Sequence, residues 1–202
     1  DGTGTASDAV TEYPDWTHIS HNLIMNGPSG NRDLGNLFPC VDNDDGSNHY
    51  FISNNVCAYG GFKNYLGQDK IWEGNLVVYP GRWSGDPCLC AWGGPNESFQ
   101  NNTCIMFDDS SSPLQLDGSI GGLHGCKIDF SNRTLMANVA MTSRNKYYTT
   151  DAQFTLECGD KQYSLAELQA HGWENASVVN KAPTVSYIID HATDLLRTCK
   201  VG

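Results

Sequence analysis

Four short segments of this chain repeat one pattern, in which a small or polar residue precedes an Asn and an apolar run follows it. The Asn lies at positions 22, 55, 75 and 102, with spacings of 33, 20 and 27 residues. A strand-like run that recurs at such intervals is typical of a solenoid of stacked coils. Side-chain amides stacked in this way hydrogen-bond along the stacking axis. The pattern therefore predicts a ladder of side chains formed by Asn22, Asn55, Asn75 and Asn102.

The simpler interpretation is that Asn is common in this chain and marks turns. Composition points to a turn-rich all-β protein in either case, because only 17% of the 202 residues are charged and 21 are Gly. A chain of this length forms one domain with its own core. We predict a polar N-terminal arm over residues 1–15, β-helix coils with long loops over 16–160, and a helical C-terminal cap over 161–202.

The C-terminal part carries two helix signals. Ser164 and Glu167 form a capping box, which predicts a short helix over residues 164–171. Apolar residues at helical spacing predict a second helix over residues 186–198. We expect both helices to close the last coil, whereas the first coil has no such segment and leaves an open β-edge.

The charge pattern excludes several partners. The formal net charge is −11 and no basic stripe is present, which disfavours nucleic acid and anionic membrane surfaces. No apolar run approaches the roughly 18–20 residues that cross a bilayer. The sequence starts at Asp1 without Met or a signal-peptide core, so we expect a processed chain or a fragment of a longer one.

Cysteines and glycosylation motifs indicate an extracellular protein. The even number of cysteines and the absence of a CxxC pair favour disulfides over a zinc site, with the pairing left open. Four Asn-X-Ser/Thr motifs favour a secreted glycoprotein. The cysteines are Cys40, Cys57, Cys88, Cys90, Cys104, Cys126, Cys158 and Cys199, and the glycosylation motifs begin at Asn96, Asn101, Asn132 and Asn175.

Two stretches resemble a known family. The first runs from Asp44 to Gly67 and contains an acidic turn, an Asn-Asn strand and a Gly-Gly-Phe-Lys turn. The second covers residues 163–172 and Ser177 to Val179. Both resemble the right-handed parallel β-helix family with the pectate-lyase-like fold, which includes β-xylosidase-like glycoside hydrolases. The resemblance implies an all-β fold, namely a short right-handed parallel β-helix with a small helical C-terminal cap.

The same resemblance implies a catalytic pair of carboxylates. The nucleophile would be Asp44 or Asp45, and the family's acid/base Glu corresponds to Leu66, which cannot donate a proton. Glu73 is the nearest Glu and the first substitute, and Asp69 is a weaker one. Retaining glycoside hydrolysis needs its two carboxyl groups about 5 Å apart.

The acidic turn has two further interpretations. Clustered carboxylates suit hard cations, so Asp42, Asp44 and Asp45 are candidate Ca²⁺ ligands. A solvated turn rich in Asp and Asn explains the same residues without any ligand. We predict no other cofactor.

The leading functional interpretation is structural. The missing Glu, the short chain, the uncapped first coil and the cysteine and glycosylation motifs favour a secreted structural glycoprotein, the repeating subunit of an extracellular filament. Head-to-tail contacts that do not close generate such filaments, and the arm over residues 1–15 could bridge neighbours. The alternative is a glycoside hydrolase, polysaccharide lyase or carbohydrate-binding module that acts on extracellular polysaccharide.

Overall fold

The computed structural model shows a protein built mostly of parallel strands, as expected for an all-β chain. Among the described residues, two helices lie in the C-terminal part of the chain. The structure describes residues 15–26, 39–43, 46–64, 67–80, 87–91, 96–106, 113–116, 141–158 and 161–197.

Within the described residues the strands form three sheets, which we call A, B and C. Sheet A contains β1 (Thr17–Ser20), β4 (Asn48–Ser53), β7 (Gln68–Glu73), β10 (Ser98–Gln100) and β13 (Met141–Ser143). Sheet B contains β2 (Leu23–Met25), β5 (Val56–Ala58), β8 (Leu76–Val78), β11 (Thr103–Ile105), β14 (Lys146–Thr149) and β17 (Val178–Lys181). Sheet C contains β3 (Val41–Asn43), β6 (Phe62–Asn64), β9 (Leu89–Ala91), β12 (Leu114–Leu116), β15 (Thr155–Cys158) and β16 (Lys161–Ser164).

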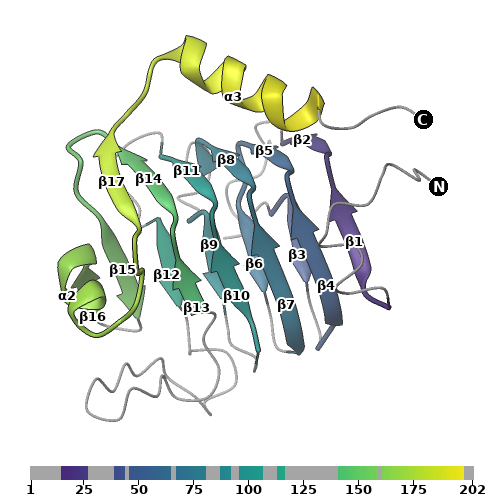
Figure 1. Cartoon of the computed structure of the whole chain (residues 1–202), viewed down its shortest axis with the longest axis horizontal. Coiled ribbons are helices and arrows are strands. Elements are labelled where there is room, and N and C mark those ends of the chain that lie inside the picture. Colours follow the sequence, from purple (N-terminus) through teal and green to yellow (C-terminus); the bar gives the residue numbers. More distant parts are fainter. Residues whose placement is uncertain are drawn as a thin grey trace, which may run out of the picture.

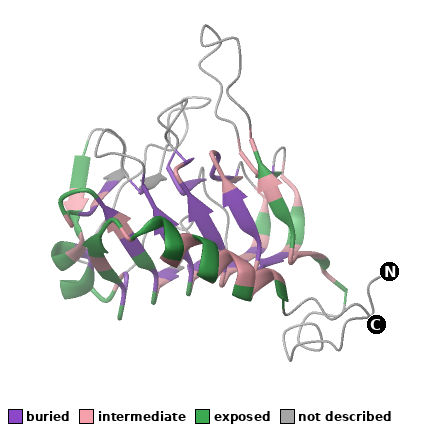
Figure 2. Ribbon diagram, turned by 90° about the horizontal axis from the view of Figure 1, so that it is seen from above, coloured by how far each residue is buried: buried purple, intermediate pink, exposed green. Residues whose placement is uncertain are grey.

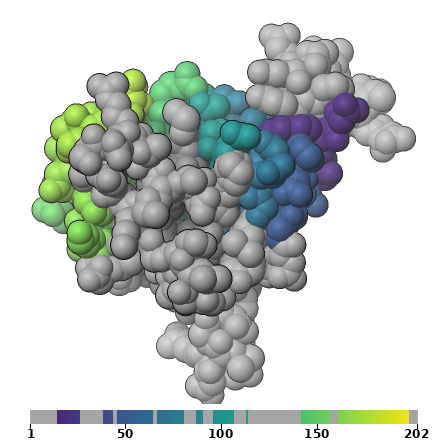
Figure 3. Space-filling view, turned by 90° about the horizontal axis from the view of Figure 1, so that it is seen from below, coloured from purple at the N-terminus to yellow at the C-terminus, as the bar shows by residue number. Residues whose placement is uncertain are grey.

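From β1 to β15 the chain visits the sheets in the order A, B, C and then returns to A, one strand further along each sheet; β16 then joins sheet C and β17 joins sheet B. We call one such run a pass. Every described strand pair is parallel except β15 with β16. Successive passes lie in sequence order along the long axis of the molecule (Figures 1 and 3). This arrangement is compatible with a parallel β-helix.

The corner between sheets A and B is the same in all five passes. Two residues join the strands, the first with positive φ and the second always Asn. The first residues are His21, Asn54, Gly74, Asn101 and Arg144, with φ between 53° and 67°. The sequence segments 16–26 and 50–59 therefore each bend at this corner into two short strands that belong to different sheets.

The core lies between the three sheets. Strand side chains alternate between inside and outside, and the inward ones include Ile52, Trp72 and Phe99, which are fully buried. Sheet B buries a second apolar set on its outer face, formed by Val56, Leu76, Val78 and Ile105. Figure 2 shows buried strand residues in the middle of the molecule and exposed ones towards both ends.

The two predicted helices are present, but they occupy different places. α2 (Leu165–Ala170) begins at the predicted capping box, in which Glu167 N donates to Ser164 Oγ. Leu168 of α2 is buried in the core, and α2 itself lies at the C-terminal end of the sheets (Figure 1). α3 (Val185–Arg197) does not close that end, because Ile188, Ala192, Leu195 and Leu196 cover the apolar outer face of sheet B.

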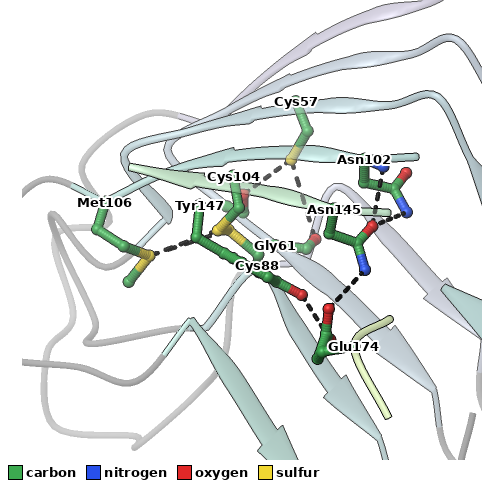
Figure 4. The surroundings of a disulfide bond; sticks show 10 residues. Cys57, Gly61, Cys88, Asn102, Cys104, Met106, Asn145, Tyr147 and Glu174 are labelled. Atoms are coloured by element: carbon green, nitrogen blue, oxygen red, sulfur yellow. Dashed lines mark hydrogen bonds between the residues drawn. A yellow bond between two sulfur atoms is a disulfide. The ribbon is translucent and has the colours of Figure 1, made fainter. Parts of the chain in front are cut away.

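Two disulfides join successive passes inside the molecule. Cys57 and Cys104 point inward from β5 and β11, and they bond to Cys40 and Cys88, which precede β3 and β9. The Cα atoms are 5.9 and 6.1 Å apart, an ordinary spacing for a disulfide. Met106 packs its sulfur against both sulfurs of the second bridge, at 3.9 and 3.6 Å (Figure 4).

Candidate functional site

The Asn residues at the A–B corner hydrogen-bond to one another along the stacking axis. The Nδ2 of each donates to the Oδ1 of the next at 2.9 Å for Asn22 to Asn55, 3.1 Å for Asn55 to Asn75 and 2.9 Å for Asn75 to Asn102. Each Oδ1 also accepts from the backbone N–H of the preceding Asn at 3.0, 3.0 and 2.9 Å. The ladder therefore provides hydrogen-bond partners for the Asn side chains and for the backbone N–H groups at the corner, where the chain leaves one sheet for the next.

The ladder extends one step further than the sequence pattern indicates. Asn102 donates to Asn145, which is fully buried in the fifth pass. Lys146 follows Asn145 and breaks the apolar run that marks the other four segments. Lys146 is exposed, so a charged residue is tolerated at this position. The Asn at position 145 is therefore the only residue of the sequence pattern that identifies this pass.

The two ends of the ladder differ. At the C-terminal end, Asn145 N donates to Ser177 Oγ, and Asn145 Nδ2 donates to Glu174, which also accepts from Tyr147 (Figure 4). The side chain of Gln169 in α2 covers this end by donating to two backbone carbonyls.

At the N-terminal end of the ladder, Asn22 is exposed. Among the described residues no donor contacts Asn22 Oδ1, the atom that accepts two bonds in Asn55, Asn75 and Asn102.

A second group of polar side chains lies inside the corner between sheets C and A. Asn64 ends β6, Lys70 lies in β7, and Glu97 precedes β10 at the level of Lys70. We call these three residues the polar corner. Lys70 Nζ donates to Asn64 Oδ1, and Asn64 Nδ2 donates to Glu97 Oε2 at 2.6 Å. Lys70 Nζ lies 3.9 Å from Glu97 Oε1.

All three side chains are enclosed by protein. Asn64 and Lys70 are fully buried, and Glu97 is 3% exposed. Burial raises the pKa of Glu97 to about 7, although the hydrogen bond from Asn64 and the charge of Lys70 oppose this shift. Glu97 is therefore a carboxyl group that changes protonation near neutral pH beside a buried amine.

The strand pattern explains why these charged residues point inward. Lys70 and Trp72 share one face of β7, and Glu97, just before β10, lies on the same side as Phe99 of β10. Trp72 and Phe99 belong to the core, so Lys70 and Glu97 are directed inward with them.

The candidate catalytic residues do not form a carboxylate pair within the described residues. Asp44, Asp45 and Leu66 lie outside them. Glu73 ends β7 level with Ser53, and its Oε1 accepts from Asn101 Nδ2 at 2.9 Å on the outside of the A–B corner. The described residues on either side of Asp44 and Asp45 are Asn43, which ends β3, and Gly46, which precedes the start of β4.

The other substitute, Asp69, lies at the start of β7 on the outside of the C–A corner. It contacts His49 Nε2 at 3.4 Å and accepts from Asn96 Nδ2 at 3.0 Å. His49 of β4, Asp69 of β7 and Asn96, which lies just before β10, all have positive φ, between 55° and 61°, and lie side by side at one level of sheet A. In the structure, Asp69 is therefore part of a row of hydrogen-bonded side chains on the surface.

The candidate Ca²⁺ ligands are described only at Asp42. Its Oδ1 lies 3.1 Å from Lys63 Nζ on the outer face of sheet C. Among the described residues no three His, Cys, Asp or Glu side chains come together as they would around a metal ion.

Three of the four glycosylation motifs begin within the described residues. Asn96, Asn101 and Asn175 are exposed, and Asn132 lies outside the described part. Asn101 points outward while Asn102 points into the ladder.

Of the cysteines outside the two disulfides, Cys90 is buried. Cys126, Cys199 and the side chain of Cys158 lie outside the part of the chain that the structure describes.

The end strands of sheet B carry exposed apolar side chains. β2 pairs only with β5, and β17 pairs only with β14, among the described strands. Leu23 and Met25 of β2 are 55% and 62% exposed, and Val178 of β17 is 46% exposed. Leu23 and Val178 are the two ends of one outer row, which continues between them through Val56, Leu76, Thr103 and Lys146.

Comparisons with protein-family models, curated proteins and solved structures find no match to this chain. Neither described helix is both long and apolar enough to cross a membrane.

Proposed function

We propose that this chain is a right-handed parallel β-helix and the structural subunit of an extracellular assembly, in which copies stack head to tail through sheet B. The cyclic order of the three sheets and their parallel strands support the β-helix, and nearly all parallel crossovers in proteins are right-handed. The two disulfides and the exposed Asn96, Asn101 and Asn175 support a secreted glycoprotein.

The observation that carries the proposal is the match between the two ends of sheet B. If β17 of one copy follows β2 of another, Val178 falls next to Leu23 and Val179 next to Ile24, in the register of the sheet. Unpaired strand edges readily accept another strand, and exposed apolar residues strengthen the contact. β16 and α2 occupy the C-terminal end of sheet C, so the contact runs through sheet B.

Two single-end variants test this arrangement. Leu23→Lys places a charge at the N-terminal end, and Val178→Lys places one at the C-terminal end. Because both side chains are exposed, we expect both variants to fold like the native protein. We expect the native protein to form elongated assemblies in sedimentation and negative-stain microscopy, and each variant alone to be monomeric. An equal mixture should form dimers, because each variant keeps the end that the other lacks.

Ile189→Lys is the matched control, because Ile189 is 58% exposed on α3 away from both ends. This variant should assemble like the native protein. Dimers of Val178→Lys alone would instead show a contact between two N-terminal ends, and a native protein that stays monomeric at high concentration would overturn the proposal.

A further inference from the structure

We propose that the side chains of Lys70 and Asn64 become joined by an amide bond, formed within the folded protein with Glu97 as the catalytic residue. The inference stands on the polar corner alone and is independent of stacking. An amine, a carboxamide and a carboxyl group in mutual contact are the three groups that such a transamidation needs.

The contacts place the reacting atoms together. Lys70 Nζ is in hydrogen-bond contact with Asn64 Oδ1, which is bonded to the carbon that the amine would attack. Fixed proximity of this kind replaces a slow encounter between two groups with a reaction inside one site. The two residues are six positions apart in the sequence, and both lie on strands that the sheets hold in place.

Glu97 spans the nucleophile and the leaving group. Its Oε2 accepts from Asn64 Nδ2, the nitrogen that would leave, at 2.6 Å. Its Oε1 faces Lys70 Nζ at 3.9 Å and makes no hydrogen bond with the described residues. One carboxyl group can therefore take a proton from the amine and give one to the departing nitrogen.

The step balances without any other reactant. A proton moves from the Lys70 ammonium to the Glu97 carboxylate, and a buried pair favours this because desolvation penalises both charges. Nζ then attacks Cγ of Asn64, the Nζ–Cγ bond forms and the Cγ–Nδ2 bond breaks. The products are the amide, one ammonia and the Glu97 carboxylic acid, so atoms and charge are conserved.

The surroundings favour this reaction over hydrolysis. The three side chains are at most 3% exposed, which keeps bulk water from the attacked carbon. Asn43, paired with Asn64 on the adjacent strand, is buried, and its Nδ2 has no hydrogen-bond partner among the described residues. That donor is available to the oxygen that becomes negative in the tetrahedral intermediate.

Tryptic digestion of the native protein with mass spectrometry tests the proposal. Trypsin cuts after Lys63, Lys70 and Arg82, but an amide at Lys70 removes its charge and prevents cleavage there. We expect one peptide of residues 64–82, lighter than its sequence by one ammonia. These residues contain neither Cys nor a glycosylation motif, so disulfides and glycans leave its mass unchanged.

Two other results would overturn the bond. Peptides 64–70 and 71–82 at their sequence masses would show that Lys70 has not reacted. Peptide 64–70 lighter by one ammonia but cut at Lys70 would show a succinimide at Asn64 and no link to Lys70.

Two variants test the role of Glu97. Glu97→Gln keeps the size and hydrogen-bonding capacity of the side chain but cannot move the proton, and we expect separate, unmodified peptides with an unchanged circular dichroism spectrum. Asp69→Asn is the matched control on the outside of the same corner and should retain the linked peptide. A linked peptide in Glu97→Gln would overturn the assignment of Glu97.

Discussion

Glu97 is a buried carboxyl group whose ionisation the fold opposes. Burial raises its pKa from 4.5 to about 7. Between these two values the folded state binds a proton that the unfolded state releases, so the contribution of Glu97 to stability is greatest below pH 4.5 and is lost as the pH rises through 7. At this residue the fold therefore favours the neutral carboxylic acid over the carboxylate.

The pH dependence of unfolding measures this effect. We expect the free energy of unfolding to fall as the pH rises from 4.5 to 7, by up to about 3 kcal/mol from Glu97 alone. Urea unfolding across this range should show a shallower slope for Glu97→Gln than for the native protein. Glu73→Gln is the control at a partly exposed carboxyl group, and an equal change in slope there would contradict the assignment.

The Asn ladder gives a second prediction for a single residue. Asn75 accepts from Asn55 and donates to Ile52 O and Asn102, so Asn75→Ala leaves several buried groups unpaired. We expect a loss of about 2–4 kcal/mol in urea unfolding, because each unpaired buried group costs about 1–3 kcal/mol. Asn101→Gly, at an exposed position whose positive φ Gly adopts without strain, should cost well below 1 kcal/mol on the same scale; similar losses would contradict the buried ladder.

Sequence reasoning predicts the ladder but misses the polar corner, and the difference is physical. Asn22, Asn55, Asn75 and Asn102 repeat in one local context, so a pattern search detects them. Lys70 and Glu97 resemble solvated charges, and only the strand register brings them together with Asn64. Lys70 lies two positions before Trp72, and Glu97 two positions before Phe99, and this spacing indicates that both charged side chains point inward with the aromatic ones. It does not indicate which residue each side chain contacts.

At the scale of elements, α3 shows what determines the surface that the apolar face of a helix covers. Its pattern predicts a helix correctly, but the pattern does not say which surface the helix covers. The outer face of sheet B offers Val56, Leu76, Val78 and Ile105, and burying these residues outweighs covering an end that α2 already closes. Predicting that surface would have required knowing the outward-facing residues of three strands, β5, β8 and β11.

Neighbouring residues of α3 test this packing. Ile188 faces sheet B, whereas Ile189 is 58% exposed. Ile188→Ala should lower the free energy of unfolding by about 1–3 kcal/mol, because a large apolar side chain is lost from a partly buried site. Ile189→Ala should change it by less than about 0.5 kcal/mol, and equal losses would show that α3 does not pack as described.

The two disulfides also act at the scale of elements, because each joins one pass to the next. Their sequence separations of 17 and 16 residues close rings that contribute about 3 kcal/mol each in the chain-entropy account. We expect a reducing agent to lower the midpoint of thermal unfolding, with the double variant Cys40→Ala and Cys57→Ala showing part of the same shift. An unchanged midpoint after verified reduction would contradict this contribution.

At the scale of the whole molecule, charge and stacking oppose each other. A chain with a net charge of −11 repels its copies, whereas the proposed contact consists of backbone edges and apolar residues. Salt screens the repulsion and leaves the apolar contact intact. Sedimentation should therefore show longer assemblies at high salt, and shorter assemblies there would indicate a contact made by ion pairs.

The uniform corner between sheets A and B has a consequence for how such a protein can change. Every pass uses two residues there, whereas the other two corners differ widely in length from pass to pass. We therefore expect those two corners to tolerate insertions and deletions, and their different lengths produce the irregular spacing of the ladder. The same rule tells a protein engineer where a foreign peptide can be displayed without disturbing the scaffold.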